Sequence, residues 1–367
     1  AVMDITVTNT PTPGCLEIEK VIDMGDMIGD LADVEDATFT VEVSGPSYPV
    51  GEELALVFQL VDGELQVWDG SAFVAGDSYC VCYLIPGEYT ASEAAPSGWE
   101  DAVITGSPAT VEAGDTCDAV MDITVTNTPT PGCLEITKLL DFAGVVNWDS
   151  IDDTIEVTVT GPSYPLGTVI NFVIEDGAVT STNPVCLDGL IPGEYNVSES
   201  AGDEWTVSMI GVDEFGDVDV PAGGTCPDTC VEVTITNDYD PGALWVKKMV
   251  DFNDVLNPEA ISENFTVIVQ GQDDESSYPV GEELVIEFRL SNGSIEAWVG
   301  GAYYASTDNV CIDGLIPGVY WVWEVEAGPE WTEDPLWPDY DAATVIANTS
   351  CISGTGVGVI VENVYCP

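Results

Sequence analysis

The chain is built from three internal repeats, which align as residues 13–130, 131–240 and 241–367. Each repeat opens with Pro-Gly and an apolar segment, namely PGCLEIEK, PGCLEITK or PGALWVKK. Each continues to a segment LIPGEYTASE, LIPGEYNVSE or LIPGVYWVWE and ends with MDITVTN, VEVTITN or VGVIVEN. Because each repeat has the length of an ordinary domain, we predict three domains of one shared fold, with these boundaries.

Short segments of alternating polar and apolar residues dominate every repeat. The dipeptides Asp62-Gly63 and Asn292-Gly293 stand between two such segments and are strong signals for β-hairpin turns. We therefore predict an all-β fold of three tandem immunoglobulin-like β-sandwiches, with a brief helix or loop near residues 23–36 and at its counterparts. The short, proline-containing linkers TPTPG and YDPG indicate that neighbouring sandwiches lie end to end as a rod.

Residues 1–18 recur letter for letter at 119–136, where they join the end of one repeat to the start of the next. Residues 1–12 thus copy a closing strand and its linker ahead of the first repeat. A free strand with an apolar row tends to pair with another chain. We therefore predict a donor strand that inserts into a neighbouring subunit, with the alternative that a longer chain lost an upstream repeat. Its inward face comprises Met3, Ile5, Val7 and Asn9.

Acidic residues outnumber basic ones by 66 to 5 and histidine is absent, which gives a net charge of −61. Nucleic acid and anionic membranes would be repelled by this charge, and no apolar run is long enough to span a bilayer. A histidine base and histidine-ligated zinc are excluded. The acidic cluster lacks EF-hand spacing, so we predict no metal site and no cofactor. The cluster comprises Asp213, Glu214, Asp217 and Asp219.

Alternation places a lysine on the core side of the first strand of each repeat. Lys20 shares its face with Leu16 and Ile18. A glutamate of the LIPG strand and an asparagine of the closing strand also point inward. Burial of a lone lysine costs several kcal/mol unless it is neutralised or paired, so we expect the three groups to meet. The three sets are Lys20, Glu93 and Asn127; Lys138, Glu199 and Asn237; and Lys248, Glu324 and Asn363.

The first-strand lysine, the L-x-x-G-x-Y-x-x-x-E-like segment and the V-x-N closing strand resemble the Cna-B/SpaA-type domains of Gram-positive pilins and adhesins. The resemblance covers all three repeats and implies a prealbumin-like sandwich. It also implies an isopeptide bond between the lysine and asparagine side chains, assisted by the glutamate. The alternative is a buried Lys–Glu ion pair with a hydrogen-bonded asparagine. The chain has no LPxTG sorting signal, so sortase-linked assembly is not expected.

Eleven cysteines indicate an oxidising, extracellular compartment. Alignment on Ile-Pro-Gly superimposes one pair per repeat and predicts Cys80–Cys117, Cys186–Cys226 and Cys311–Cys351. Two further pairs vanish together from the third repeat, which favours Cys15–Cys82 and Cys133–Cys230, although spacing alone does not establish connectivity. Cys366 is left over, as a free thiol or an inter-chain link.

Two surface features complete the pattern. Four sequons are candidate glycosylation sites, at Asn196, Asn264, Asn292 and Asn348. Trp321 and Trp323 fall on the outward face of their strand, as a contact surface or under a local loop from Trp331 to Trp337.

Together these features predict a structural protein rather than an enzyme, apart from autocatalytic isopeptide formation. We expect a subunit of an extracellular filament, a pilus-like fibril on the cell surface. Its partners are other copies of itself, joined head to tail through the N-terminal strand, and glycans. The alternative is a cell-surface adhesin or stalk protein made of the same repeats.

Overall fold

The computed structural model describes residues 12–117, 123–299, 302–304, 308–325, 327–333 and 341–366. These residues form an all-β fold, as predicted, with three 3₁₀ turns where the sequence indicated a brief helix or loop: Leu31–Asp33, Trp148–Ser150 and Pro258–Ala260. The predicted donor-strand residues Met3, Ile5, Val7 and Asn9 lie outside the described part. Within that part, no helix is long and apolar enough to cross a membrane.

The first repeat forms two sheets that enclose its core. One has the order β6-β1-β10-β8 (Ser78–Leu84, Gly14–Ile22, Ile123–Asn127, Val103–Thr105). The other has the order β5-β4-β3-β2-β7-β9 (Phe73–Ala75, Glu64–Trp68, Leu54–Val61, Ala37–Ser44, Gly87–Glu93, Ala109–Val111).

The second and third repeats have matching pairs of sheets. In the second, β15-β11-β19-β17 (Val185–Leu190, Gly132–Asp141, Val231–Tyr239, Trp205–Ile210) accompanies β14-β13-β12-β16-β18 (Ala178–Val179, Tyr164–Glu175, Asp153–Gly161, Gly193–Ser200, Asp217–Val220). In the third, β25-β20-β29-β27 (Asn309–Leu315, Gly242–Asp251, Val357–Tyr365, Trp331–Glu333) accompanies β24-β23-β22-β21-β26-β28 (Ala302–Tyr304, Ser294–Val299, Leu284–Ser291, Glu263–Gly271, Gly318–Val325, Asp341–Val345).

Turn chemistry and alternation explain these elements. The two predicted hairpins are present as β3–β4 and β22–β23, and both residues of each turn have positive φ, as a type I′ turn requires. Along β1, Leu16, Ile18 and Lys20 are buried whereas the glutamates between them are partly exposed. The core therefore lies between the two sheets of each repeat, as in a β-sandwich.

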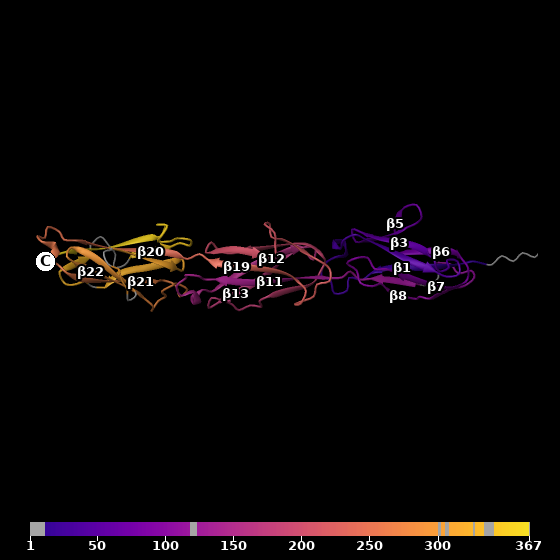
Figure 1. The fold of residues 1–367 in the computed structure, drawn as a ribbon, viewed down its shortest axis with the longest axis horizontal. Coiled ribbons are helices and arrows are strands. Elements are labelled where there is room, and N and C mark those ends of the chain that lie inside the picture. The colour runs from indigo at the N-terminus through magenta and orange to yellow at the C-terminus, as the bar shows by residue number, and fades with distance from the viewer. Residues whose placement is uncertain are drawn as a thin grey trace, which may run out of the picture.

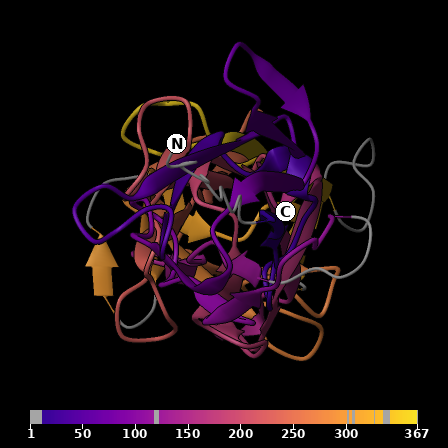
Figure 2. The same ribbon diagram turned by 90° about the vertical axis from the view of Figure 1, so that its right-hand side faces the viewer.

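The first and closing strands of each repeat lie side by side and parallel, β1 with β10, β11 with β19 and β20 with β29. Figure 1 shows the repeats one after another along the long axis, and in the end-on view of Figure 2 they overlap. The molecule is an elongated rod, which the short linkers predicted.

Candidate functional site

The predicted lysine, glutamate and asparagine of each repeat meet between its two sheets. In the first repeat, Lys20 lies on β1, Asn127 on the parallel strand β10, and Glu93 at the end of β7 in the facing sheet. The register pairs Lys20 with Val125, two residues before Asn127, so both side chains enter the core from one face. All three side chains are buried.

In the first repeat the lysine is held by the glutamate. The Nζ atom of Lys20 lies 3.2 and 3.0 Å from the two carboxylate oxygens of Glu93, and 4.4 Å from the centre of the Phe39 ring. Burial lowers the pKa of Lys20, and the neighbouring carboxylate of Glu93 opposes that shift. The amide atoms Oδ1 and Nδ2 of Asn127 are buried without a hydrogen-bond partner among the described residues.

In the second repeat all three groups are in mutual contact. The Nζ atom of Lys138 contacts both Oε2 of Glu199 and Oδ1 of Asn237. The Nδ2 atom of Asn237 donates a hydrogen bond to Oε1 of Glu199 at 2.6 Å. Burial again lowers the pKa of Lys138, against its hydrogen bond and charge interaction with Glu199. The glutamate thus bridges the amine and the amide.

The third repeat reproduces this bridge. The Nζ atom of Lys248 lies 2.9 Å from Oε2 of Glu324, and Nδ2 of Asn363 donates to Oε1 of the same carboxylate at 3.0 Å. Lys248 also lies 4.4 Å from the centre of the Phe265 ring, as Lys20 does from Phe39. Those two aromatic rings were not anticipated from the sequence, although both occupy the same inward position of the strand after the 3₁₀ turn.

Such a set of groups has one chemistry beyond ion pairing. A buried amine that loses its proton is a nucleophile, and a side-chain amide offers a carbonyl carbon and a leaving group. A carboxylate that touches both can carry a proton from one nitrogen to the other. The geometry therefore suits amide exchange between lysine and asparagine.

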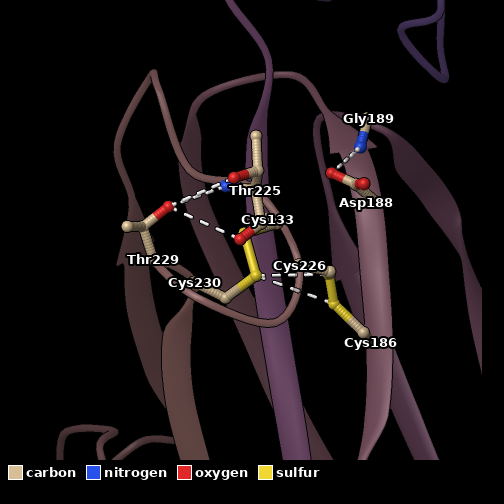
Figure 3. Close-up of a disulfide and its surroundings, with 8 residues drawn as sticks. All are labelled: Cys133, Cys186, Asp188, Gly189, Thr225, Cys226, Thr229 and Cys230. Carbon is tan, nitrogen blue, oxygen red and sulfur yellow. Dashed lines mark hydrogen bonds between the residues drawn. A yellow bond between two sulfur atoms is a disulfide. The ribbon is translucent and has the colours of Figure 1, made fainter.

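Disulfides lie beside the start of each lysine strand. The structure forms the five pairs that the repeat alignment predicts: Cys15–Cys82, Cys80–Cys117, Cys133–Cys230, Cys186–Cys226 and Cys311–Cys351. Figure 3 shows the two disulfides of the second repeat next to each other, with the Sγ atoms of Cys186 and Cys230 separated by 3.6 Å. Cys366 is an exposed free thiol beside Thr332.

The predicted glycosylation sites differ in their surroundings. Asn264, Asn292 and Asn348 are exposed. Asn196 is half-buried, and its Nδ2 atom donates to the carbonyl of Phe215 at 2.9 Å and to Asp217 at 2.8 Å. A glycan on Asn196 would have to replace at least one of these hydrogen bonds.

The two tryptophans on the outward face of β26 were predicted to form a contact surface or to lie under a local loop. Trp321 and Trp323 are half-buried, and the residue expected to cover them, Trp331, instead packs in the core against Phe265 and Tyr365. Trp337 lies outside the described residues.

In the acidic cluster, Oδ1 of Asp213 accepts backbone hydrogen bonds from residues 215 and 217, which hold the pKa of Asp213 below its ordinary value.

No family model and no curated protein matches this chain. Among solved structures, the TIE protein of Bacillus anthracis is similar at 15% identity and a TM-score of 0.49, over 97% of this chain and 51% of that one, so the chain spans about half of its length. A streptococcal ancillary pilin (12% identity, TM-score 0.27) and BcpA, the major pilin subunit of Bacillus cereus (10%, 0.32), each align over 96% of this chain and 99% of their own. All three TM-scores lie below 0.5, so these similarities assign neither a family nor a function.

Proposed function

We propose that this chain is a structural subunit of an extracellular, pilus-like filament, made of three sandwich domains with the boundaries 13–130, 131–240 and 241–367. The observation that supports it best is the repetition of one device along a rod: each repeat places a buried lysine, glutamate and asparagine between its sheets. Each repeat also has a disulfide nearby. Covalent ties at equivalent places suit a protein that carries tension along its length.

The ties we propose are isopeptide bonds from Lys20 to Asn127, Lys138 to Asn237 and Lys248 to Asn363. The neutral Nζ attacks the Cγ carbon of the asparagine, the Nζ–Cγ bond forms, and the Cγ–Nδ2 bond breaks. The glutamate accepts a proton from the attacking amine and delivers it to Nδ2, which leaves as ammonia. No oxidant or cofactor enters this balance. The contact of Lys138 with Asn237 and the hydrogen bond from Asn237 to Glu199 support this route.

For assembly we propose that the N-terminal strand adds to a neighbouring subunit head to tail. We propose the third repeat of the neighbouring subunit as the acceptor, where the added strand pairs beside the closing strand β29 or displaces it. The apolar residues of the N-terminal sequence recur in β10, where Ile123 and Val125 are buried, which supports such strand addition.

A second candidate function, an adhesin or stalk, is favoured by one surface of the third repeat. The outer face of its larger sheet carries Trp298 beside Arg289 and Glu296, around a pocket of about 250 Å³. An aromatic ring beside charged groups suits a polar ligand with a flat apolar face, such as a sugar. A glycan-binding screen in which Trp298→Ala loses a signal of the parent would favour this function.

Electron microscopy of the purified, disulfide-bonded protein tests the proposed function. We expect fibres from the parent and dispersed rods after deletion of residues 1–10. Fibres from both proteins would contradict the donor strand but not the filament. Dispersed rods from the parent under every ionic condition would contradict the filament itself.

A further inference from the structure

The repeats are connected by two joints of the same design. The backbone N–H of Ile28 donates to the carbonyl of Gly189 at 2.8 Å, and the N–H of Val146 donates to the carbonyl of Gly314 at 2.8 Å. Ile28 and Val146 occupy equivalent places in the loop after the lysine strand. Gly189 and Gly314 both stand directly before Leu-Ile-Pro-Gly. We call the loop after the lysine strand the tail of a repeat, and the loop around its LIPG segment the head. The tail of one repeat thus binds the head of the next through equivalent backbone atoms.

Each joint buries the isoleucine of the LIPG segment in the preceding repeat. Ile191 is 1% exposed and belongs to the hydrophobic core of the first repeat. Ile316 is 6% exposed and packs with Val145, Ile151 and Trp205 of the second repeat. These inserted isoleucines, together with the backbone hydrogen bond, define the joint.

The head of the first repeat carries the same loop uncovered. Ile85 is the LIPG isoleucine there and is 53% exposed. The hydroxyl of Tyr89 donates to the carbonyl of Ile85 at 2.8 Å, as the hydroxyls of Tyr195 and Tyr320 do to the carbonyls of the two inserted isoleucines. The loop is therefore held in its inserting shape without a described neighbour over it.

The tail of the third repeat carries the complementary half. Leu256 stands at the position of Ile28 and Val146 and is 93% exposed. In the same repeat Trp331 packs edge-on against Phe265 and Tyr365, much as Trp205 packs against Tyr239 in the cluster that holds the inserted Ile316. Figure 1 places this tail and the head of the first repeat at opposite ends of the rod.

We propose that the tail of the third repeat is a socket for the Leu84–Gly87 loop of a second copy, so that copies meet end to end through a third joint of the same kind. This inference rests on the proposed function and names the surfaces that would meet in the filament. A second copy is the occupant that the molecule itself indicates. The chain already fits this loop into this tail twice, and among the described residues the exposed loop of the first repeat and the exposed tail of the third repeat are the remaining pair.

One residue makes the joint between copies different from the internal ones. Tyr83 replaces the glycine before LIPG and keeps its left-handed backbone, with φ of 65° against 71° and 83° at Gly189 and Gly314. A Cβ atom at Gly314 would lie 2.2 Å from the carbonyl oxygen of Gly144, and one at Gly189 would lie 2.8 Å from that of Asp26. Tyr83 therefore holds the two loops apart, and the joint between copies is weaker than those within a copy.

Sedimentation of the full-length protein at high ionic strength, where repulsion between the acidic chains is screened, tests the inference. We expect Ile85→Asp and Leu256→Asp each to weaken association by roughly tenfold or more, because either places a charge in an apolar contact. Tyr83→Gly should tighten association by about fivefold, since it restores one backbone hydrogen bond. Val50→Asp is the matched control. It adds the same charge to the same head, at a position whose equivalents Leu166 and Val280 stay exposed beside both internal joints.

Mixing the two charged variants gives the sharpest readout. Each retains one intact end, so an equimolar mixture should form one-to-one complexes and nothing longer. The inference is overturned by a wild-type protein that stays monomeric, by Ile85→Asp and Val50→Asp weakening association equally, or by a mixture that forms no complex. Fibres that persist in Ile85→Asp would overturn this joint and leave the filament intact. End-to-end oligomers that never become fibres would contradict the filament and leave the joint intact.

Discussion

Glu199 accepts a hydrogen bond from Nδ2 of Asn237 at 2.6 Å while its other carboxylate oxygen contacts Nζ of Lys138. One buried carboxylate thus touches the group that would attack and the group that would leave. Glu324 has the same relationship to Lys248 and Asn363. In the first repeat the ion pair is present, and the amide of Asn127 has no described partner.

The intact mass reports directly on the isopeptide bonds. With all three formed, the fully reduced protein should be lighter than its sequence mass by three molecules of ammonia. Glu199→Ala removes the proton carrier of the second repeat only, so the mass deficit of this variant should be two molecules of ammonia instead of three. The peptides that contain Lys138 and Asn237 should then separate on digestion. An unmodified mass for the parent would show that the three sets are ion pairs.

The adjacent residues Lys247 and Lys248 allow the contribution of an exposed lysine to stability to be compared with that of a buried one. Lys248→Met removes both the proposed bond to Asn363 and the buried nitrogen that lies 2.9 Å from Oε2 of Glu324, and it should cost about 3–5 kcal/mol of the free energy of unfolding of the third repeat. Lys247→Met removes a charge from a surface pair with Asp308, 3.4 Å apart, and should cost less than about 1 kcal/mol. Urea denaturation followed by tryptophan fluorescence measures both. Equal losses in the free energy of unfolding would mean that the buried Lys248 stabilises the repeat no more than the exposed Lys247 does.

A variant in which one isopeptide bond is blocked should gain a pH dependence of stability that the parent lacks. Asn127→Ala leaves Lys20 as a titrating amine whose pKa burial holds below its ordinary 10.5. Between the lowered pKa and 10.5 the unfolded chain binds more protons than the folded one, so the stability of this variant should rise with pH. In the parent the bonded nitrogen does not titrate, and this rise should be absent.

Buried tyrosines set the highest pH at which that measurement can be interpreted. Burial raises the pKa of Tyr195, Tyr239 and Tyr320, so ionisation of tyrosines in the unfolded chain lowers stability above about pH 10. Denaturation curves should therefore be compared between about pH 8 and 9.5. A flat profile for Asn127→Ala over that range would contradict the lowered lysine pKa.

The stability of the third repeat should depend more on its one predicted disulfide than the stability of the second repeat depends on either of its two. Cys311–Cys351 closes a loop with a sequence separation of 40, and its removal by serine substitution should cost roughly 3–4 kcal/mol on the chain-entropy model. The matched substitution of Cys186 and Cys226, with the same separation, leaves Cys133–Cys230 in place. We expect limited proteolysis to cleave the third repeat of the first variant sooner than the second repeat of the other.

Sequence alone predicted the parts of the site that repeat. The fold class, the inward face of Lys20 and the cysteine pairs all follow from alternation and from comparison of the repeats. The joints do not, because Ile85, Ile191 and Ile316 stand in the same LIPG segment yet differ in exposure. What separates them is the neighbour that packs over each one, and no local pattern encodes that. Trp331 likewise resembles a surface residue by its loop position but packs in the core beneath the tail.

The rigidity of the rod should depend on a glycine in each joint. Gly314 has φ of 83°, and a Cβ atom there would lie 2.2 Å from the carbonyl oxygen of Gly144. Gly314→Ala should still fold, since Tyr83 carries a side chain at the equivalent position, but the second joint should lose its hydrogen bond and bend. Small-angle scattering should then show a shorter maximum dimension. Gly354→Ala is the control, because it carries a similar strain at φ of 70° with nothing within 4 Å of the added atom. If the two variants scatter alike, the close backbone contact is not what keeps the rod straight.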